Sequence, residues 1–134
     1  MVKEIITSKS APTTGFTDAA KPPPIVQAIR AGGMLFVSGQ GPLDPLTKTV
    51  VEGDIEVQTR RTLANLISVL EAGGATLANV VNMRVVLRNV ADFPRFNEVF
   101  RDVLDGEKVT RTCIGGTPHR AGVNVEIDCI AVLD

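Results

Sequence analysis

The sequence contains no tryptophan and no tyrosine, and only one histidine and two cysteines among its 134 residues. Single-stranded RNA is commonly bound by stacking its bases on aromatic side chains, so the lack of Trp and Tyr weighs against that mode of binding. Two cysteines, Cys113 and Cys129, do not make a disulfide framework. Because no CxxC pair or histidine cluster is present, the sequence predicts neither a metal site nor a cofactor.

The chain also lacks an excess of charge of either sign and a long hydrophobic run. It carries 14 Lys and Arg against 15 Asp and Glu, a net charge of −1. Nucleic-acid binding requires a basic footprint that this balance does not supply, so no nucleic-acid partner is expected. No apolar run reaches the length of a membrane span, and the N-terminal residues lack the apolar core of a signal peptide. These absences favour a cytoplasmic protein without a membrane partner.

Short segments with the two-residue periodicity of strands occur in both halves of the chain. They are residues 5–6, 26–31, 34–38, 80–88 and 123–133. Gly32-Gly33 is a hairpin signal between the second and the third segment. No repeat or composition break divides the chain, so residues 1–134 are interpreted as one domain.

Two further segments have helical periodicity. One follows Asp54, a suitable N-cap, and is expected to end at Gly73-Gly74. Glu56 and Arg60 are expected to form an i,i+4 pair on this helix. The other is expected to begin at Asp92 as its cap and to carry an apolar stripe of Phe93, Phe96, Phe100, Val103 and Leu104. The element order β-β-β-α-β-α-β predicts an α+β fold with both helices on one face of a mixed sheet.

Arg111 is the most unusual polar residue of the chain. It lies in a short, partly apolar segment, and a guanidinium that is partly buried needs an anion. One interpretation is a structural salt bridge with Glu126 or Asp128, which composition alone favours. The other is an anchor for the carboxylate of a small ligand, which the planar guanidinium matches with two parallel hydrogen bonds.

Other candidate residues have two interpretations each. Asn97 falls on the apolar side of its helix. It is either a hydrogen-bonded amide at the edge of the core or a polar group that lines a pocket. Glu126 lies on the polar face of the last strand. It is either a solvated surface residue or, if a neighbouring subunit covers that face, a group that polarises water. Cys113 has no nearby histidine to activate it as a nucleophile, so its backbone or small side chain is expected to shape a pocket wall. His119 is expected in an exposed loop, and Gly39 allows a tight turn or a close ligand.

These residues stand in segments that resemble the RidA (YjgF, L-PSP) family between about Pro24 and Leu133. The segments are Phe36-Val37-Ser38-Gly39-Gln40, Asp44-Pro45, Glu71-Ala72-Gly73-Gly74, Asp92-Phe93 with Asn97, Arg111-Thr112-Cys113 and Val125-Glu126-Ile127. The resemblance implies a chorismate-mutase-like fold and a homotrimer with ligand clefts between subunits. It also implies hydrolysis of reactive enamines and imines, such as 2-aminoacrylate, to a keto acid and ammonia.

The resemblance assigns a role to each candidate residue. Arg111 matches the arginine that binds the substrate carboxylate, and Glu126 matches the carboxylate that positions or polarises the attacking water. Cys113 matches a cysteine whose backbone lines the site, and Gly39 and Asn97 match further positions around the cleft. A small carboxylate-bearing imine or keto acid is therefore the expected partner.

The sequence departs from the family pattern near this site. Ile25 stands in the substrate-binding position where deaminase-type members carry a tyrosine, and Val109-Thr110 replaces the Pro-Ala that precedes the arginine. Gly115-Gly116 replaces bulkier residues after Cys113. These changes leave open a non-catalytic protein that binds small carboxylates or keto acids, and an endoribonuclease is the less favoured alternative.

Overall fold

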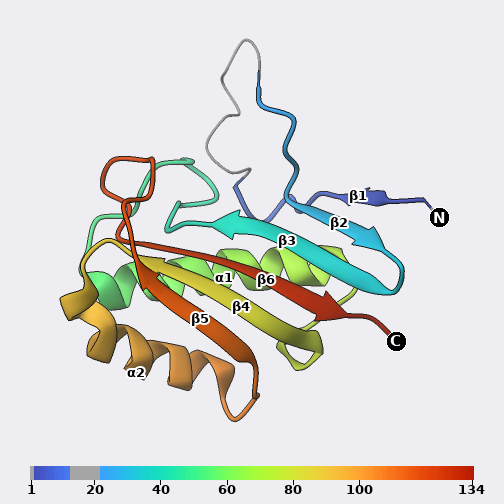
Figure 1. Cartoon of the computed structure of the whole chain (residues 1–134). Helices are drawn as coiled ribbons and strands as arrows, with labels where there is room; N and C mark the ends of the chain where they lie inside the picture. Colours follow the sequence, from blue (N-terminus) through green and yellow to red (C-terminus); the bar gives the residue numbers. More distant parts are fainter. Residues whose placement is uncertain (1, 13–21) are drawn as a thin grey trace.

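The computed structural model describes residues 2–12 and 22–134, in which six strands form one mixed sheet. The strands are β1 (Glu4–Ile6), β2 (Ala28–Ala31), β3 (Met34–Gln40), β4 (Val80–Leu87), β5 (Thr110–Gly115) and β6 (Val125–Val132). Their order across the sheet is β1-β2-β3-β6-β4-β5 (Figure 1). Only β4 and β5 pair in parallel, and every other neighbouring pair is antiparallel.

Two α-helices cover one face of this sheet and pack against each other (Figure 1). They are α1 (Ile55–Ala72) and α2 (Phe93–Leu104). The short 3-10 helix η1 (Leu77–Asn79) follows α1, and the short 3-10 helix η2 (Val90–Asp92) directly precedes α2. The expected α+β fold, a mixed sheet with both helices on one face, is confirmed. Among the helices of residues 2–12 and 22–134, none is both long enough and apolar enough to cross a membrane.

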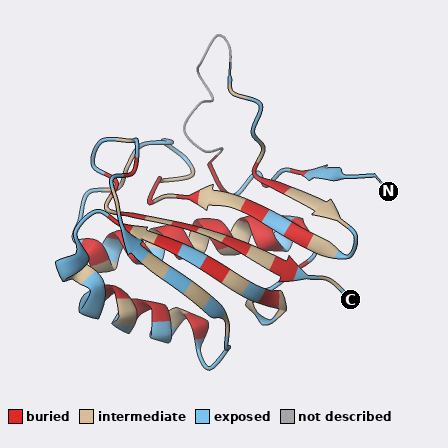
Figure 2. Cartoon of the chain, viewed as in Figure 1, coloured by how far each residue is buried: buried red, intermediate tan, exposed pale blue. Residues whose placement is uncertain are grey.

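The hydrophobic core lies between the sheet and the two helices. In β6, buried residues alternate with half-buried ones, and Figure 2 shows the same banding on the neighbouring strands. The buried residues of β6 are Val125, Ile127, Cys129 and Ala131, each 1% exposed or less. This burial raises the pKa of the Cys129 thiol to about 12, so Cys129 is a neutral core residue.

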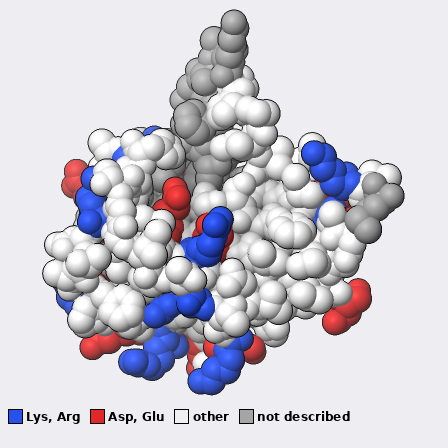
Figure 3. Space-filling view, viewed as in Figure 1, with Lys and Arg blue, Asp and Glu red and all other residues white. Residues whose placement is uncertain are grey.

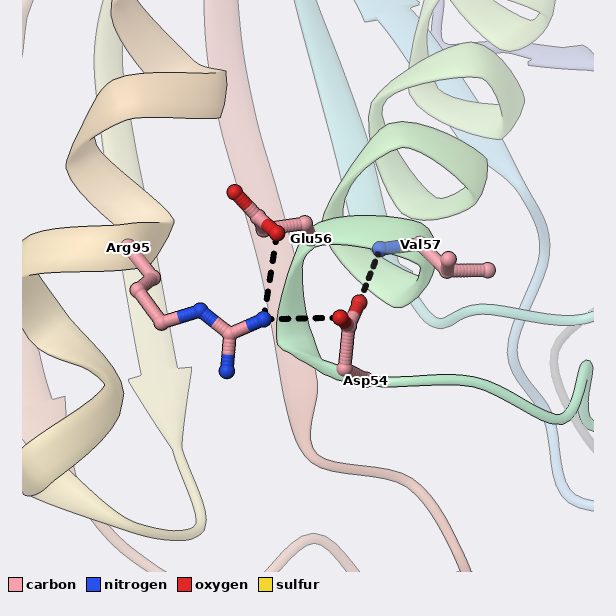
Figure 4. A network of polar contacts seen from close by, with 4 residues as sticks. All are labelled: Asp54, Glu56, Val57 and Arg95. Carbon is pink, nitrogen blue, oxygen red and sulfur yellow. Dashed lines mark hydrogen bonds and ion pairs between the residues drawn. The ribbon is translucent and has the colours of Figure 1, made fainter.

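The start of α1 is capped as the sequence predicts, but its surface ion pair is different. The Asp54 carboxylate accepts a hydrogen bond from Val57 N at 3.0 Å. Arg95, from α2, bridges Asp54 at 2.7 Å and Glu56 at 3.0 Å, so it ties the first turns of both helices together (Figure 4). The expected Glu56–Arg60 pair is therefore wrong, because each of the two has a partner on α2: Arg95 for Glu56 and Asp102 for Arg60.

The second helix begins differently from the expectation. Asp92 precedes it but forms no side-chain capping bond, because η2 leads directly into α2. The capping side chain is that of Asn89, which accepts a hydrogen bond from Ala91 N at 3.0 Å. At the other end, Asp105 adopts the left-handed conformation, with φ of 46°, and ends the helix after Leu104.

The expected element order omits one strand, β5. This strand lies at the edge of the sheet and its residues are exposed or half-buried, so it lacks the strong apolar alternation that reveals β4 and β6. The observed order is β-β-β-α-β-α-β-β. The strand β5 matters for function, because it carries Arg111 and Cys113.

Candidate functional site

Arg111 lies on an aromatic surface built by α2. Its guanidinium carbon lies 4.8 Å from the ring centroid of Phe100, 5.5 Å from that of Phe93 and 5.7 Å from that of Phe96. The electron-rich faces of these rings stabilise a cation. The apolar stripe of α2 thus serves two purposes, since it packs the core and also holds a positive charge. The spacing of the three phenylalanines was visible in the sequence, but only the placement of β5 beside α2 reveals the second purpose.

Asn97 fixes the orientation of this guanidinium. Arg111 Nη1 donates a hydrogen bond to Asn97 Oδ1 at 2.8 Å. The acceptor is a neutral amide, so the positive charge of Arg111 is retained. The alternative of a salt bridge to Glu126 or Asp128 does not hold among the described residues, where Asp128 pairs with Arg84 at 3.0 Å and no carboxylate forms an ion pair with Arg111.

Open cavities lie on both sides of Arg111 along β5. A cavity of about 430 Å³ opens between Arg111, Asn97 and the C-terminal end of α2. A second cavity, of about 300 Å³, lies beside Cys113 and Phe93. Partial burial raises the pKa of the Cys113 thiol, against the opposing effect of the Arg111 charge. The thiol is therefore protonated at neutral pH, which agrees with a wall residue and disfavours a nucleophile.

Glu126 and Gly39 form a second group of candidate residues, on β6 and β3. A Cβ atom added at Gly39 would lie 3.1 Å from Glu126 Cδ and 3.2 Å from its Oε2. The absence of a side chain at position 39 therefore makes room for the carboxylate of Glu126. Both residues line a small hollow of about 30 Å³, the volume of roughly one water molecule, together with His119 and Arg120.

Two polar side chains, not anticipated as site residues from the sequence, hold the loop that borders this hollow. Arg88 donates hydrogen bonds to the carbonyl oxygens of Val123, Pro118 and Arg120, at 2.9, 3.3 and 3.3 Å. From α1, the buried Gln58 donates to Gly122 O and accepts from Asn124 N, both at 2.8 Å. Because Asn124 leads into β6, these contacts fix the loop next to Glu126.

The residues around Arg111 and the group formed by Glu126 and Gly39 lie on opposite faces of the sheet. Arg111 is in register with Met83, which is fully buried against the helices. Glu126 is in register with Val86 and lies between two core residues of β6, so its side chain points to the face without helices. In Figure 3 this face has little charge, with a few acidic and basic side chains side by side near its middle. One copy of the chain therefore does not bring Arg111 and Glu126 together.

Ile25 belongs to the Gly39 side of this arrangement. It is 47% exposed and precedes β2. Ser38, the neighbour of Gly39, donates from its hydroxyl to Val26 O and from its backbone to Gln27 O. These bonds hold the segment after Ile25 against β3. The candidate residues thus form two groups, with Arg111, Asn97 and Cys113 in one and Gly39, Glu126 and Ile25 in the other.

Comparisons with known proteins agree with this architecture. Residues 18–133 match the model of the family described as Endoribonuclease L-PSP. A RutC family protein of Pyrococcus horikoshii is 40% identical over 118 residues, which cover 87% of this chain and 94% of that protein.

Solved structures share the fold over nearly the whole length. Escherichia coli TdcF with bound serine is 30% identical with a TM-score of 0.85, covering 98% of this chain and 99% of TdcF. The YjgF gene product of E. coli is 27% identical with a TM-score of 0.82, covering 96% and 98% of the two chains. The RidA-type fold expected from the sequence motifs is thereby confirmed.

Proposed function

Because the chain belongs to the Endoribonuclease L-PSP family, the group of RidA, YjgF and RutC proteins, we propose that it hydrolyses small reactive enamine and imine acids. The products are a keto acid and ammonia. The observation that carries the proposal is the positively charged guanidinium of Arg111, which is oriented by a neutral amide and borders an open cavity.

Arg111 binds the substrate carboxylate in this proposal. One of its nitrogen atoms is engaged by Asn97, and the planar guanidinium offers further N–H donors for a carboxylate. Charge-assisted hydrogen bonds of this kind each contribute about 1.5–3 kcal/mol. The bound serine of TdcF, a small molecule with a carboxylate, supports a ligand of this size and charge.

Glu126 positions and polarises the attacking water. The hollow beside Glu126 and Gly39 has room for roughly one water molecule, and the carboxylate is available to accept its proton. The enamine first tautomerises to the imine. Water then adds its oxygen to the C=N carbon, and one of its protons passes to the nitrogen. The hydroxyl of the resulting carbinolamine gives up its proton to the same nitrogen as the C–N bond breaks, which leaves the C=O group of the keto acid and releases ammonia. This reaction needs positioning and a proton acceptor, without a covalent nucleophile.

The two groups of residues form one site when copies of the chain assemble. Arg111, Asn97 and Cys113 of one subunit then face Gly39, Glu126 and Ile25 of the next, in a homotrimer with clefts between subunits. The support for this assembly is that Arg111 and Glu126 point to opposite faces of the same sheet. A cyclic arrangement places such opposite surfaces in contact.

The test is to supply 2-aminoacrylate from a PLP-dependent dehydratase and to follow keto-acid release. We expect acceleration by the wild-type protein and loss of it in Arg111→Ala. Arg60→Ala is the matched control, because Arg60 is an exposed arginine on α1 that pairs with Asp102. Full acceleration by Arg111→Ala would contradict the proposal. Calorimetry that showed keto-acid binding without turnover of any imine would favour a non-catalytic binding protein instead.

A further inference from the structure

An apolar cavity lies beside Cys113 at the edge of the sheet. It has a volume of about 300 Å³ and is lined by Leu87, Val90, Phe93, Cys113, Ile114 and Gly115. Three of these side chains are unusually exposed for their type: Val90 is 66% exposed, Ile114 56% and Phe93 39%. Apolar side chains gathered around an open cavity indicate a surface that covers an apolar group.

The shape of this cavity depends on Gly115 and Val90. A Cβ atom at position 115 would lie 2.6 Å from Val90 Cγ1, which is closer than non-bonded carbon atoms pack. A side chain at position 115 and the observed position of Val90 therefore exclude each other. Glycine at this position lets the side chain of Val90, from η2, pack against β5 and line the cavity together with Cys113 and Ile114.

The cavity lies next to the proposed carboxylate anchor. Arg111 and Cys113 are two residues apart on one strand and share a face, which separates their Cα atoms by roughly 6.6 Å. Phe93 connects them, because its ring lies 5.5 Å from the Arg111 guanidinium and also lines the cavity. A ligand whose carboxylate binds Arg111 thus has its other end within reach of this apolar wall.

The lining also excludes charged groups. None of its six residues carries a charge, and the Cys113 thiol is neutral because its pKa is raised by burial. A second carboxylate or an ammonium group placed here would lose water without gaining a partner. A cavity of this volume has room for several carbon atoms, well beyond the methyl or methylene group of the smallest imino acids.

From these observations we infer that the cavity is a side-chain pocket, and that the preferred substrates are imines of amino acids with aliphatic or aromatic side chains of several carbons. The inference rests on the proposed hydrolysis of imines and makes it more specific. Val90 and Gly115 are the residues that determine this specificity, while Arg111 supplies the common carboxylate contact.

The test is a comparison of imines generated by an L-amino-acid oxidase from alanine, leucine, phenylalanine and aspartate, with catalase present to remove peroxide. Hydrolysis is followed as the decrease in semicarbazone formed when semicarbazide traps the remaining imine. We expect kcat/KM for the leucine-derived imine to exceed that for the alanine-derived imine roughly tenfold or more, since each methylene in an apolar pocket contributes about that factor. Equal values, or a preference for the aspartate-derived imine, would overturn the inference.

Val90→Ser tests the wall directly, and folding is not at risk because Val90 is mostly exposed. We expect the leucine-to-alanine ratio of kcat/KM to fall roughly tenfold, because two apolar methyl groups leave the wall. Val57→Ser is the matched control, since Val57 is a 47% exposed valine on α1 that lies outside the cavity lining. A ratio that is unchanged in Val90→Ser would overturn the role of Val90.

The failure of the pocket and the failure of the proposed function give different results. If imines are hydrolysed without any dependence on side-chain length, the proposed hydrolysis is supported and the assignment of the cavity as a side-chain pocket is wrong. If no imine is hydrolysed, the proposed function fails. Calorimetry with pyruvate and 4-methyl-2-oxopentanoate then tests whether the cavity binds an apolar side chain. Tighter binding of the longer keto acid, weakened in Val90→Ser, would support it, and equal binding would refute it.

Discussion

Arg111 Nη1 donates a hydrogen bond to Asn97 Oδ1 across 2.8 Å, which joins the edge strand β5 to the helix α2. The amide orients the guanidinium but does not neutralise it. Three phenylalanine rings of α2 lie within 5.7 Å of the same guanidinium and leave its charge intact. The contact therefore holds a cation in place while keeping it available to an anionic ligand.

Replacing this amide by a carboxylate tests that conclusion. In Asn97→Asp, the new negative charge lies where Asn97 Oδ1 now accepts the hydrogen bond and competes with the ligand carboxylate for Arg111. We expect KM for imino acids to rise by about 10- to 150-fold, corresponding to one charge-assisted hydrogen bond. Steady-state kinetics and keto-acid calorimetry measure the effect. Asn97→Ala, which removes the orienting bond without adding charge, should raise KM less, and a larger rise in Asn97→Ala would contradict the electrostatic explanation.

Local sequence patterns predict most of this fold because most elements have local signals. Asp54 caps α1 through its own side chain, and β6 alternates buried and half-buried residues from Val125 to Ala131. The strand β5 has no such signal, since it is a sheet edge whose conformation depends on pairing with β4. The Glu56–Arg60 pair fails for a related reason, because α2 brings Arg95 and Asp102 to these residues from a distant part of the chain.

The candidate site is predictable as a set of residues but not as an arrangement. Family motifs identify Arg111 and Glu126, yet nothing local to either residue shows that they lie on opposite faces of the sheet. That relationship follows from the order β6-β4-β5 and from the register of Arg111 with Met83 and of Glu126 with Val86. Strand order and register are long-range properties, so the separation of Arg111 from Glu126 within one copy of the chain emerges only from the fold, whereas clefts between subunits are already implied by the family resemblance.

Mixed assemblies test whether two subunits share a site. Arg111→Ala and Glu126→Gln should each be inactive when alone. When the two variants are unfolded and refolded together in equal amounts, a site is intact only where one subunit supplies Arg111 and its neighbour supplies Glu126. Random mixing gives this combination in about a quarter of the sites of a cyclic assembly, so about a quarter of the wild-type activity should return. No recovery from a refolded mixture, with recovery in refolded wild type, would place both residues in one subunit's site.

The cap of α1 should make stability depend on pH. The hydrogen bond from Val57 N, assisted by Arg95, holds the pKa of the Asp54 carboxyl below its ordinary value of 3.8. A carboxyl whose pKa is lower in the folded state stabilises the protein above its unfolded pKa, and this contribution is lost as pH falls through the folded pKa. The Tm of Asp54→Ala should therefore be lower than that of wild type at neutral pH, and the difference should shrink below about pH 4.

Asp54→Asn separates the two contributions of this residue, because asparagine keeps an oxygen for Val57 N but has no charge for Arg95. Its Tm should lie between those of wild type and Asp54→Ala. Thermal unfolding followed by circular dichroism from pH 7 to pH 3 measures all three proteins. A difference between wild type and Asp54→Ala that stayed constant over this range would show that the ionised carboxylate has no part in the cap.

Gly39→Ala should act on catalysis through Glu126. The added methyl would lie 3.1 Å from Glu126 Cδ and 3.2 Å from its Oε2, closer than carbon and oxygen atoms ordinarily pack, so the carboxylate must move. Because Arg111 is untouched, we expect kcat to fall while KM changes little, the same pattern as in Glu126→Gln. The double variant Gly39→Ala with Glu126→Gln should be no slower than Glu126→Gln alone, since both changes remove one function. Additive losses of kcat in the double variant would instead give Gly39 a role of its own, such as a close approach of the ligand to its backbone.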